Sequence, residues 1–328
     1  MPGPGLFRSP GPSRSGMGLG RPRDWLIGGA LLLGLVIAVQ KGVGWRALLV
    51  PWTTLSPWVL FTAFALTALS YWLRAVRVYD FFGSLLRGRF SAVLRLSVLH
   101  NTANNLLPMR AGELLFPWLM RRYFGHGFLA AGASLLWIRL LDLHFLGLVG
   151  WLILWLRDPA WLWVLAALAW IVLLPVAGRL VLVFSRTSVS HGRLWRIASV
   201  IAGAGPAEPR SIGRLYLWTA AIWSLKLVAF AAVLGHFVAV DFWKVLAGVI
   251  GAELSTVLPF HGIAGAGSYE LATVAAMLPF GISAADALGG AVNLHLFLLG
   301  TTLVLGGLAL LIPIRTQIQT GSSAENGS

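Results

Sequence analysis

The chain alternates long apolar stretches with short polar and basic connections. Six stretches are uniform enough to be single transmembrane helices, namely 25–40, 57–73, 128–156, 160–183, 214–239 and 286–312. A helix needs about 20 apolar residues to cross a bilayer, so the first stretch is somewhat short. It follows an arginine-containing segment and could be a signal peptide. Because no small-x-small cleavage site follows, we favour a retained helix.

Two further apolar stretches, 93–120 and 244–280, are interrupted by proline and glycine. Each is too long for one regular span and too broken for two good ones. We therefore predict two re-entrant hairpins, in which half-helices meet at a loop inside the membrane. Such a loop requires protein or a water-filled cavity to satisfy its backbone. Two short full crossings per hairpin are the alternative, and they leave the flanking topology unchanged.

Composition supports a membrane protein over most of the length. The 328 residues are 58% hydrophobic and 11% charged, with a mean hydropathy of +0.80, whereas soluble domains are about 45–50% apolar and about 25% charged. The predicted fold class is an all-α polytopic membrane protein of about six transmembrane helices plus two re-entrant hairpins. We expect a disordered basic segment at 1–24, a membrane domain at 25–312 and a polar tail at 313–328. The absence of cysteine excludes disulfide and thiolate chemistry.

The basic residues are distributed unevenly between the two sides of this topology. Eighteen of the 25 lysines and arginines fall on the side of the N-terminus, with Arg74 and Arg77 counted in the loop after the second span, and four fall on the other side. Because cytoplasmic loops are enriched in basic residues, both termini are predicted to be cytoplasmic in a multi-pass protein of the cell (inner) membrane. The net charge of +14 then indicates loops that face anionic lipids rather than a nucleic-acid partner.

The predicted topology contains an inverted repeat. In each half, a span, a hairpin and another span follow in the same order, with opposite direction. The first hairpin reads NNLLPMRAGE (Asn104–Glu113) and the second reads STVLPFHGIAGAGSYE (Ser255–Glu270). Both contain Leu-Pro, then glycine, then glutamate, although these residues are common here and chance recurrence is the alternative. Paired broken segments of this kind are typical of transporter sites near the bilayer midplane.

Ionisable residues at membrane depth are costly and usually face a partner or a cavity. The candidate substrate-binding residues are Asn104, Arg110, Glu113, Arg139, Asp142, Lys226, His261 and Glu270. The candidate structural residues of the two loops are Pro108, Gly112, Pro259, Gly262, Gly265 and Gly267. The pairs Arg110–Glu113 and Arg139–Asp142, each three residues apart, could instead only neutralise each other. We expect no metal site and no catalytic residues, because no grouping has metal-ligand spacing and no nucleophile–base arrangement is evident.

The motif NNLLPMRAGELL, with ASLLWIRLLDLHFLGLVG at 133–150, resembles the transmembrane family typified by the lipid-translocating domain of lysyl-phosphatidylglycerol synthases. The matching positions are Asn104, Leu106, Leu107, Pro108, Arg110, Gly112, Glu113, Arg139 and Asp142, and in the second loop Pro259, Gly262, Gly265, Gly267 and Glu270. The second loop reads HGIAGAGSYE and so departs from the commoner Gly-Gly-x-Gly form. The resemblance covers about 25–312 and implies a protein that moves or binds a lipid, without the soluble synthase domain.

The leading functional prediction is a non-enzymatic lipid transporter or flippase. A lipid with an anionic or phosphate-bearing headgroup would bind between the hairpin loops, and arginine is suited to bidentate phosphate contacts. The alternative is a membrane-embedded enzyme, or its accessory subunit, in lipid-linked glycan, aminoacyl-lipid or hopanoid biosynthesis. A purely structural partner in a lipid-biosynthetic complex is a third possibility. We expect no cofactor, membrane lipids as partners, and either a homo-oligomer or a biosynthetic enzyme partner.

Overall fold

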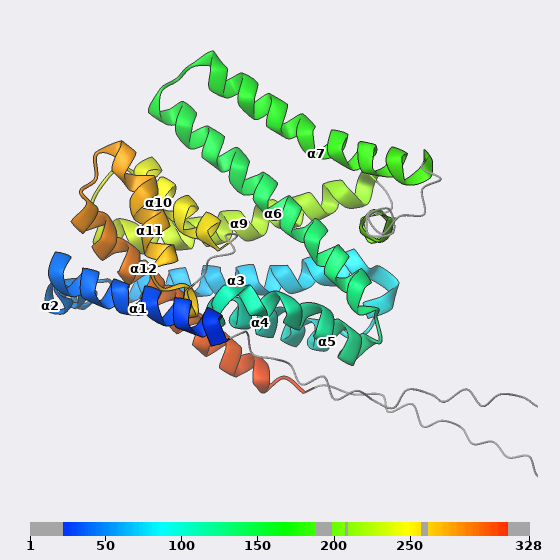
Figure 1. Cartoon of the computed structure of the whole chain (residues 1–328), viewed down its shortest axis with the longest axis horizontal. Helices are drawn as coiled ribbons and strands as arrows, with labels where there is room; N and C mark the ends of the chain where they lie inside the picture. Colours follow the sequence, from blue (N-terminus) through cyan, green and yellow to red (C-terminus); the bar gives the residue numbers. More distant parts are fainter. Residues whose placement is uncertain (1–21, 188–198, 207–208, 257–261, 314–328) are drawn as a thin grey trace, which may run out of the picture.

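The computed structural model (Figure 1) describes residues 22–187, 199–206, 209–256 and 262–313. All regular secondary structure in these ranges is helical. The first half contains α1 (Pro22–Gly42), α2 (Trp45–Leu49), η1 (Val50–Thr53), α3 (Pro57–Phe82), η2 (Gly83–Leu86), α4 (Phe90–Leu106), η3 (Pro108–Leu114), α5 (Leu115–Phe124) and α6 (Phe128–Arg157). The remainder contains α7 (Trp161–Thr187), α9 (Pro209–Phe237), α10 (Phe242–Ser255), η4 (Ile263–Gly265), α11 (Ser268–Met277), η5 (Leu278–Phe280) and α12 (Ala284–Leu310).

Four helical segments are long and apolar enough to cross a membrane: Pro57–Leu86, Phe128–Arg157, Arg210–Phe237 and Ala284–Leu311. They confirm a multi-pass helical membrane protein. The predicted span at 25–40 corresponds to α1, of which Gly29–Gly42 qualifies as a possible crossing together with Trp45–Thr53, across a bend of 93°. The predicted span at 160–183 lies in α7, whose described apolar part, Trp161–Leu173, is shorter than a crossing. The described residues thus support four or five spans, and the predicted count of six stays a prediction.

The first broken segment is the succession α4, η3 and α5. Helix α4 ends where Pro108 constrains the preceding residue, and Leu107 accordingly adopts an extended conformation with φ −84° and ψ 139°. Gly112 in η3 then lies directly against the backbone of Ala103 and Asn104, where a Cβ atom would clash. The break predicted from Leu-Pro and the following glycine is therefore present at this position.

The second broken segment is the succession α10, η4 and α11. Helices α10 and α11 pack against each other, with η4 between them. Gly267 precedes α11 with φ 84°, a left-handed conformation that glycine adopts without strain. The backbone N–H of Gly267 donates a hydrogen bond of 2.8 Å to the side-chain carboxylate of Glu270. Pro259 and His261 lie outside the described residues.

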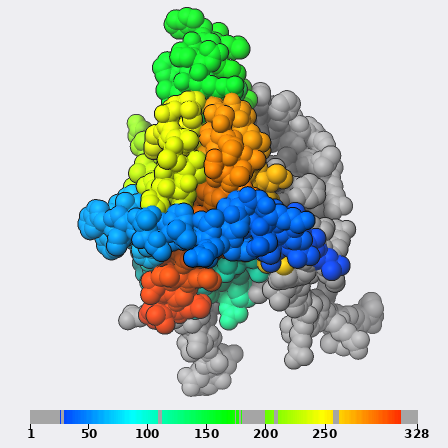
Figure 2. All heavy atoms as spheres, turned by 90° about the vertical axis from the view of Figure 1, so that its left-hand side faces the viewer, coloured from blue at the N-terminus to red at the C-terminus, as the bar shows by residue number. Residues whose placement is uncertain are grey.

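The two breaks lie against each other. η3 contacts η4, and α1 contacts both. Figure 2 shows α1 and α2 as a blue band that crosses the face of the molecule, between α10 and α11 on one side and α12 on the other. Binding of a headgroup between the two loops, as predicted, requires the loops to be neighbours, and in the described residues they are. The re-entrant path and the inverted repeat stay predictions.

Each half of the chain has its own hydrophobic core. One cluster joins α3, α4, α5 and α6, with Phe116 and Met120 among its fully buried side chains. The other is built mainly from α9, α10 and α12, with Phe230 and Leu234 at its centre. Helix α3 packs along α9 and thereby joins the halves, while α6 and α7 form a hairpin that extends away from the rest (Figure 1). The polar residues described next lie between the two cores.

Candidate functional site

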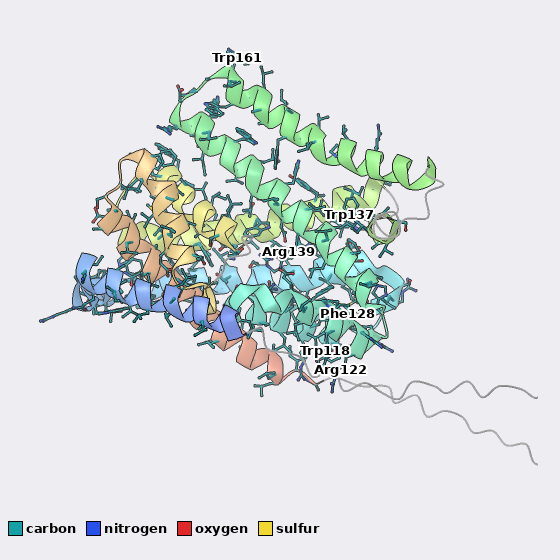
Figure 3. The ribbon with its side chains drawn as sticks, viewed as in Figure 1. Trp118, Arg122, Phe128, Trp137, Arg139 and Trp161 are labelled. Carbon is teal, nitrogen blue, oxygen red and sulfur yellow. The ribbon has the colours of Figure 1, made fainter. Side chains whose placement is uncertain are left out.

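A cavity of about 180 Å³ lies between the two halves. Its polar lining comes from α3, α4, α6, α9 and α10, and from Thr256 just after α10. The polar and aromatic lining residues are Arg74, Asn101, Asn104, Asn105, Arg139, Asp142, Trp223, Lys226, Glu253 and Thr256. Figure 3 shows Arg139 on α6 where this helix crosses the centre of the molecule. A charged cavity inside a bundle of apolar helices is the arrangement expected of a binding or transport site.

Asp142 on α6 is the most strongly bound carboxylate of the site. It accepts a hydrogen bond from Arg77 of α3 at 2.6 Å and another from the indole N–H of Trp223 on α9 at 2.8 Å. Arg77 also donates to the hydroxyl of Thr219 at 2.7 Å. Arg77 and Asp142 are both almost fully buried. This network joins α3, α6 and α9, and its burial indicates a structural contribution.

Arg139 connects the first broken segment to α6. Its guanidinium lies 2.9 Å from a carboxylate oxygen of Glu113 in η3 and 3.5 Å from Asp142. It also donates to Nε2 of His100 at 3.2 Å, so Nδ1 of that ring carries the proton and donates to the carbonyl of Gly112 at 3.1 Å. Asn104 donates to the same Glu113 oxygen at 3.1 Å. Arg139 and Glu113 keep about a quarter of their side-chain surface accessible.

Lys226 and Glu253 form the ion pair of the second half. The ammonium of Lys226 on α9 lies 2.7 Å from a carboxylate oxygen of Glu253 on α10, and both side chains are buried. The other oxygen of Glu253 is buried without a hydrogen-bond partner. Lys226 also lies over the aromatic rings of Trp223 and Phe230. The cavity wall therefore includes a charged pair whose carboxylate retains hydrogen-bonding capacity.

Arg74 on α3 differs from the other cations of the cavity. It is 6% exposed, and within the described part of the chain it has neither a hydrogen bond nor an ion pair. Its guanidinium carbon lies 5.1 Å from the centroid of the Trp223 ring. The three carboxylates that surround the cavity are already engaged, Asp142 by Arg77, Glu113 by Arg139 and Glu253 by Lys226. Among the described residues, the four cations of the site thus exceed the three carboxylates by one charge, and Arg74 is the cation without a direct carboxylate contact.

One edge of the cavity is apolar and accessible from outside the protein. Leu136, Leu140 and Leu143 of α6 line the cavity, yet they are 42%, 39% and 36% exposed. Their spacing of four and three residues places them on one face of the helix. Because α6 is one of the four candidate spans, exposed leucines on it are expected to face lipid. The cavity therefore combines a charged interior with an apolar rim.

The sequence was compared with models of known protein families. The model of the lysylphosphatidylglycerol synthase transmembrane region matches residues 25–306. The chain belongs to this family. A comparison with curated protein sequences found no match. Membership supports a membrane protein in lipid-related processes, and it confirms the relationship that the motif residues indicated.

The residues predicted from the sequence differ in how closely they approach the cavity. Asn104, Arg139, Asp142 and Lys226 line it, and Glu113 contacts Arg139 at its edge. Pro108 and Gly112 shape the neighbouring break, and Gly262, Gly265 and Gly267 lie around η4. Arg110 lies in η3, but its side chain is outside the described residues, so its proposed role stays a prediction. No cluster of three or more potential metal ligands occurs in the described ranges.

Glu270 is not among the residues that line the described cavity. One oxygen accepts from the N–H of Gly267, and the other lies 2.5 Å from Nδ1 of His295 on α12. Nε2 of His295 lies 2.8 Å from the carbonyl of Ala264, a residue with φ 53°. The contacts of Glu270 hold η4, α11 and α12 together, so its geometry favours a structural role.

Two arginines of the site were not predicted as site residues from the sequence. Arg74 and Arg77 were expected in a basic loop after the span 57–73, but α3 continues to Phe82 and buries both. The placement in a loop is therefore wrong. The physical reason is that α3 faces Asp142 and the cavity at these positions, so the charged side chains have polar surroundings. Their spacing of three residues, immediately after an uninterrupted apolar stretch, was the available signal, because it places both on one helical face.

Proposed function

We propose that the protein is a lipid transporter that moves a lipid with an anionic, phosphate-bearing headgroup between the two leaflets of the membrane. The observation that carries the proposal is the pairing of a cationic cavity with the exposed leucine rim on α6. A headgroup could enter the charged interior while its acyl chains remain along Leu136, Leu140 and Leu143. An apolar rim favours a ligand with apolar parts, because contact with the rim removes the apolar surface of both from water. A fully polar, water-soluble solute would gain nothing from this contact.

The broken helices supply the second part of the proposal. η3 and η4 contact each other, and Glu113 of η3 pairs with Arg139 in the cavity lining. Pro108 and Gly112 lie in the first break, and Gly262, Gly265 and Gly267 lie around the second. Hinge residues at such breaks can absorb backbone rotation while the flanking helices move as rigid bodies. Alternating exposure of the cavity to the two leaflets would follow from rearrangement at these breaks. The cytoplasmic placement of both termini and residence in the inner membrane are part of the same proposal.

The test is lipid movement by the purified full-length protein in liposomes. Fluorescent phosphatidylglycerol, phosphatidylcholine and diacylglycerol would be followed by loss of fluorescence when an impermeant reductant is added outside. We expect the protein to accelerate movement of phosphatidylglycerol most. Liposomes that contain Glu113→Gln protein serve as the matched control.

Lipid extraction from the same liposomes tests the competing function. Transport predicts that every probe is recovered chemically unchanged. A new lipid product in the presence of plausible co-substrates would instead favour a membrane-embedded enzyme. Unaccelerated movement of all three probes by folded protein would contradict the proposed transport.

A further inference from the structure

Among the described cations of the site, the guanidinium of Arg74 is the one that no ion pair accounts for. Arg77, Arg139 and Lys226 each contact a carboxylate, and Arg74 contacts none. An isolated buried charge is unfavourable by several kcal/mol, and proteins normally pair it or neutralise it. Arginine keeps its proton at any physiological pH, so neutralisation by deprotonation is not available to it. Because no described carboxylate contacts Arg74, an external anion can take that place.

We infer that Arg74 is the residue that binds the phosphate of the lipid headgroup, and that it selects anionic over zwitterionic lipids. The inference deepens the proposed transport function and rests on it for the lipid as source of the phosphate. The Nε atom of Arg74 is buried without a partner. The two terminal nitrogens have no hydrogen bond within the described residues either and are not among the fully buried unpartnered atoms, and the side chain lines the cavity. A planar guanidinium presents such nitrogens in a geometry that matches two phosphate oxygens.

The surroundings of Arg74 hold its guanidinium in position before any ligand arrives. Arg74 projects from α3 across the Trp223 ring, and Trp223 is fixed in turn by its hydrogen bond to Asp142. Asn101, Asn104 and Asn105 of α4 line the same cavity and supply neutral polar groups. A preorganised cation binds a ligand more tightly than a mobile one because less conformational freedom is lost. Arg74 is thus a fixed anion receptor rather than a flexible surface charge.

Selectivity follows from the carboxylates. A zwitterionic headgroup such as phosphocholine brings a cation next to its phosphate, and that cation needs a negative partner when it leaves water. The carboxylates Asp142, Glu113 and Glu253 are already paired with Arg77, Arg139 and Lys226. One oxygen of Glu253 has no hydrogen-bond partner, but Lys226 already balances the charge of that carboxylate. A headgroup with a phosphodiester and uncharged hydroxyls, such as phosphoglycerol, carries a single negative charge that can pair with Arg74. It contains no cation, so it needs no carboxylate as a partner. We therefore expect phosphatidylglycerol to bind more tightly than phosphatidylcholine, and diacylglycerol not to bind at this site.

The test measures thermal unfolding of the purified full-length protein in detergent during titration with each of these lipids. Arg74→Met retains an unbranched side chain against Trp223 and removes the charge. We expect its apparent affinity for phosphatidylglycerol to fall about 10- to 100-fold, as expected for loss of hydrogen bonds to a charged group. Without lipid, Arg74→Met should unfold at a higher temperature than the wild type, because an unpaired buried charge has been removed. A structural role for Arg74 predicts the opposite shift.

Arg95→Met is the matched control, because Arg95 of α4 is partly buried, donates to the carbonyl of Ile312 at 2.7 Å and does not line the cavity. It should retain the response to phosphatidylglycerol. Equal loss of the response in both variants would overturn the inference, as would a response to phosphatidylglycerol that Arg74→Met leaves unchanged. Inorganic phosphate alone is the second probe. If it stabilises the protein as strongly as the lipid does, the site takes free phosphate and the assignment to a lipid is wrong.

The same variants separate this inference from the proposed function. If Arg74→Met protein moves lipids in liposomes with an unchanged preference for phosphatidylglycerol, the assignment of Arg74 fails and transport stands. If wild-type protein binds phosphatidylglycerol through Arg74 but moves no lipid, the assignment stands as a binding site and transport fails.

Discussion

Arg139 and Glu113 form an ion pair of 2.9 Å that ties the broken segment η3 to the middle of α6. The pair is only partly buried, with about a quarter of each side chain accessible. It is therefore suited to rearrangement in a way that the deeply buried Arg77–Asp142 pair is not. The two pairs are connected, because Arg139 also contacts Asp142. Their difference in burial predicts that variants of Glu113 lose lipid movement and that variants of Asp142 lose stability.

Glu113→Gln should abolish lipid movement with a small effect on stability. Removing a partly solvated charge pair is expected to lower the free energy of unfolding by about 1 kcal/mol. The measurements are denaturant unfolding in detergent and movement of phosphatidylglycerol in liposomes. The double variant Glu113→Gln, Arg139→Gln removes both charges and should remain inactive. Restored lipid movement in the double variant would mean that Glu113 and Arg139 only neutralise each other's charge and that neither is needed for transport.

Asp142→Asn should destabilise the protein strongly. The substitution leaves the buried guanidinium of Arg77 without its carboxylate, which typically costs about 3–5 kcal/mol. Asp80→Asn is a control, because Asp80 pairs with Arg214, whose side chain is 55% exposed, and should cost less than about 1 kcal/mol. Denaturant unfolding of both variants gives the comparison. Equal stability of the two would show that the buried network does not hold α3, α6 and α9 together.

Glu270→Gln should affect stability and spare lipid binding. Its carboxylate contacts Gly267 and His295, away from the described cavity. The substitution is therefore expected to weaken the packing of η4 and α12 and to leave the cavity unchanged. His295→Leu should be more destabilising, by about 3–5 kcal/mol, if it leaves the buried carboxylate charged and without that partner. Affinity for phosphatidylglycerol, measured on folded protein, should match the wild type in Glu270→Gln. A selective loss of affinity at unchanged stability would return Glu270 to the binding site.

Ser84→Cys and Asp158→Cys test the orientation. Both positions are exposed, and each lies in a connection, Ser84 after α3 and Asp158 after α6. The chain has no native cysteine, so each variant carries a single thiol. The basic asymmetry predicts Ser84 inside and Asp158 outside. An impermeant thiol reagent added to intact cells should label Asp158→Cys alone, and permeabilisation should make Ser84→Cys reactive. The reverse pattern would invert the topology.

The breaks in the two apolar stretches could be predicted because proline and glycine act locally. Pro108 restricts Leu107, and Gly112 permits the approach to Asn104, whatever the rest of the chain does. Arg74 and Arg77 were misplaced because a charge next to an apolar stretch has the same sequence pattern whether it faces a loop or a buried carboxylate. Which of the two applies depends on Asp142, 65 positions from Arg77.

The partners of the second half show the same limit. Glu253 and Glu270 both flank the broken stretch, and nothing local distinguishes them. Packing brings Lys226 to Glu253 and His295 to Glu270, so one carboxylate lines the cavity and the other supports η4. Contacts between residues far apart in the chain decide such roles, and hydrophobic patterning carries no information about them.

The leucine rim of α6 bears on the size of the site. A membrane lipid is many times larger than a cavity of about 180 Å³, yet only the headgroup has to leave the surface of the membrane. Each methylene drawn into water costs about 0.8 kcal/mol, so passage of ten would cost about 8 kcal/mol. Tails that slide along Leu136, Leu140 and Leu143 never meet that barrier. On the proposed function, transport would then tolerate wide variation in acyl length while remaining strict about the headgroup.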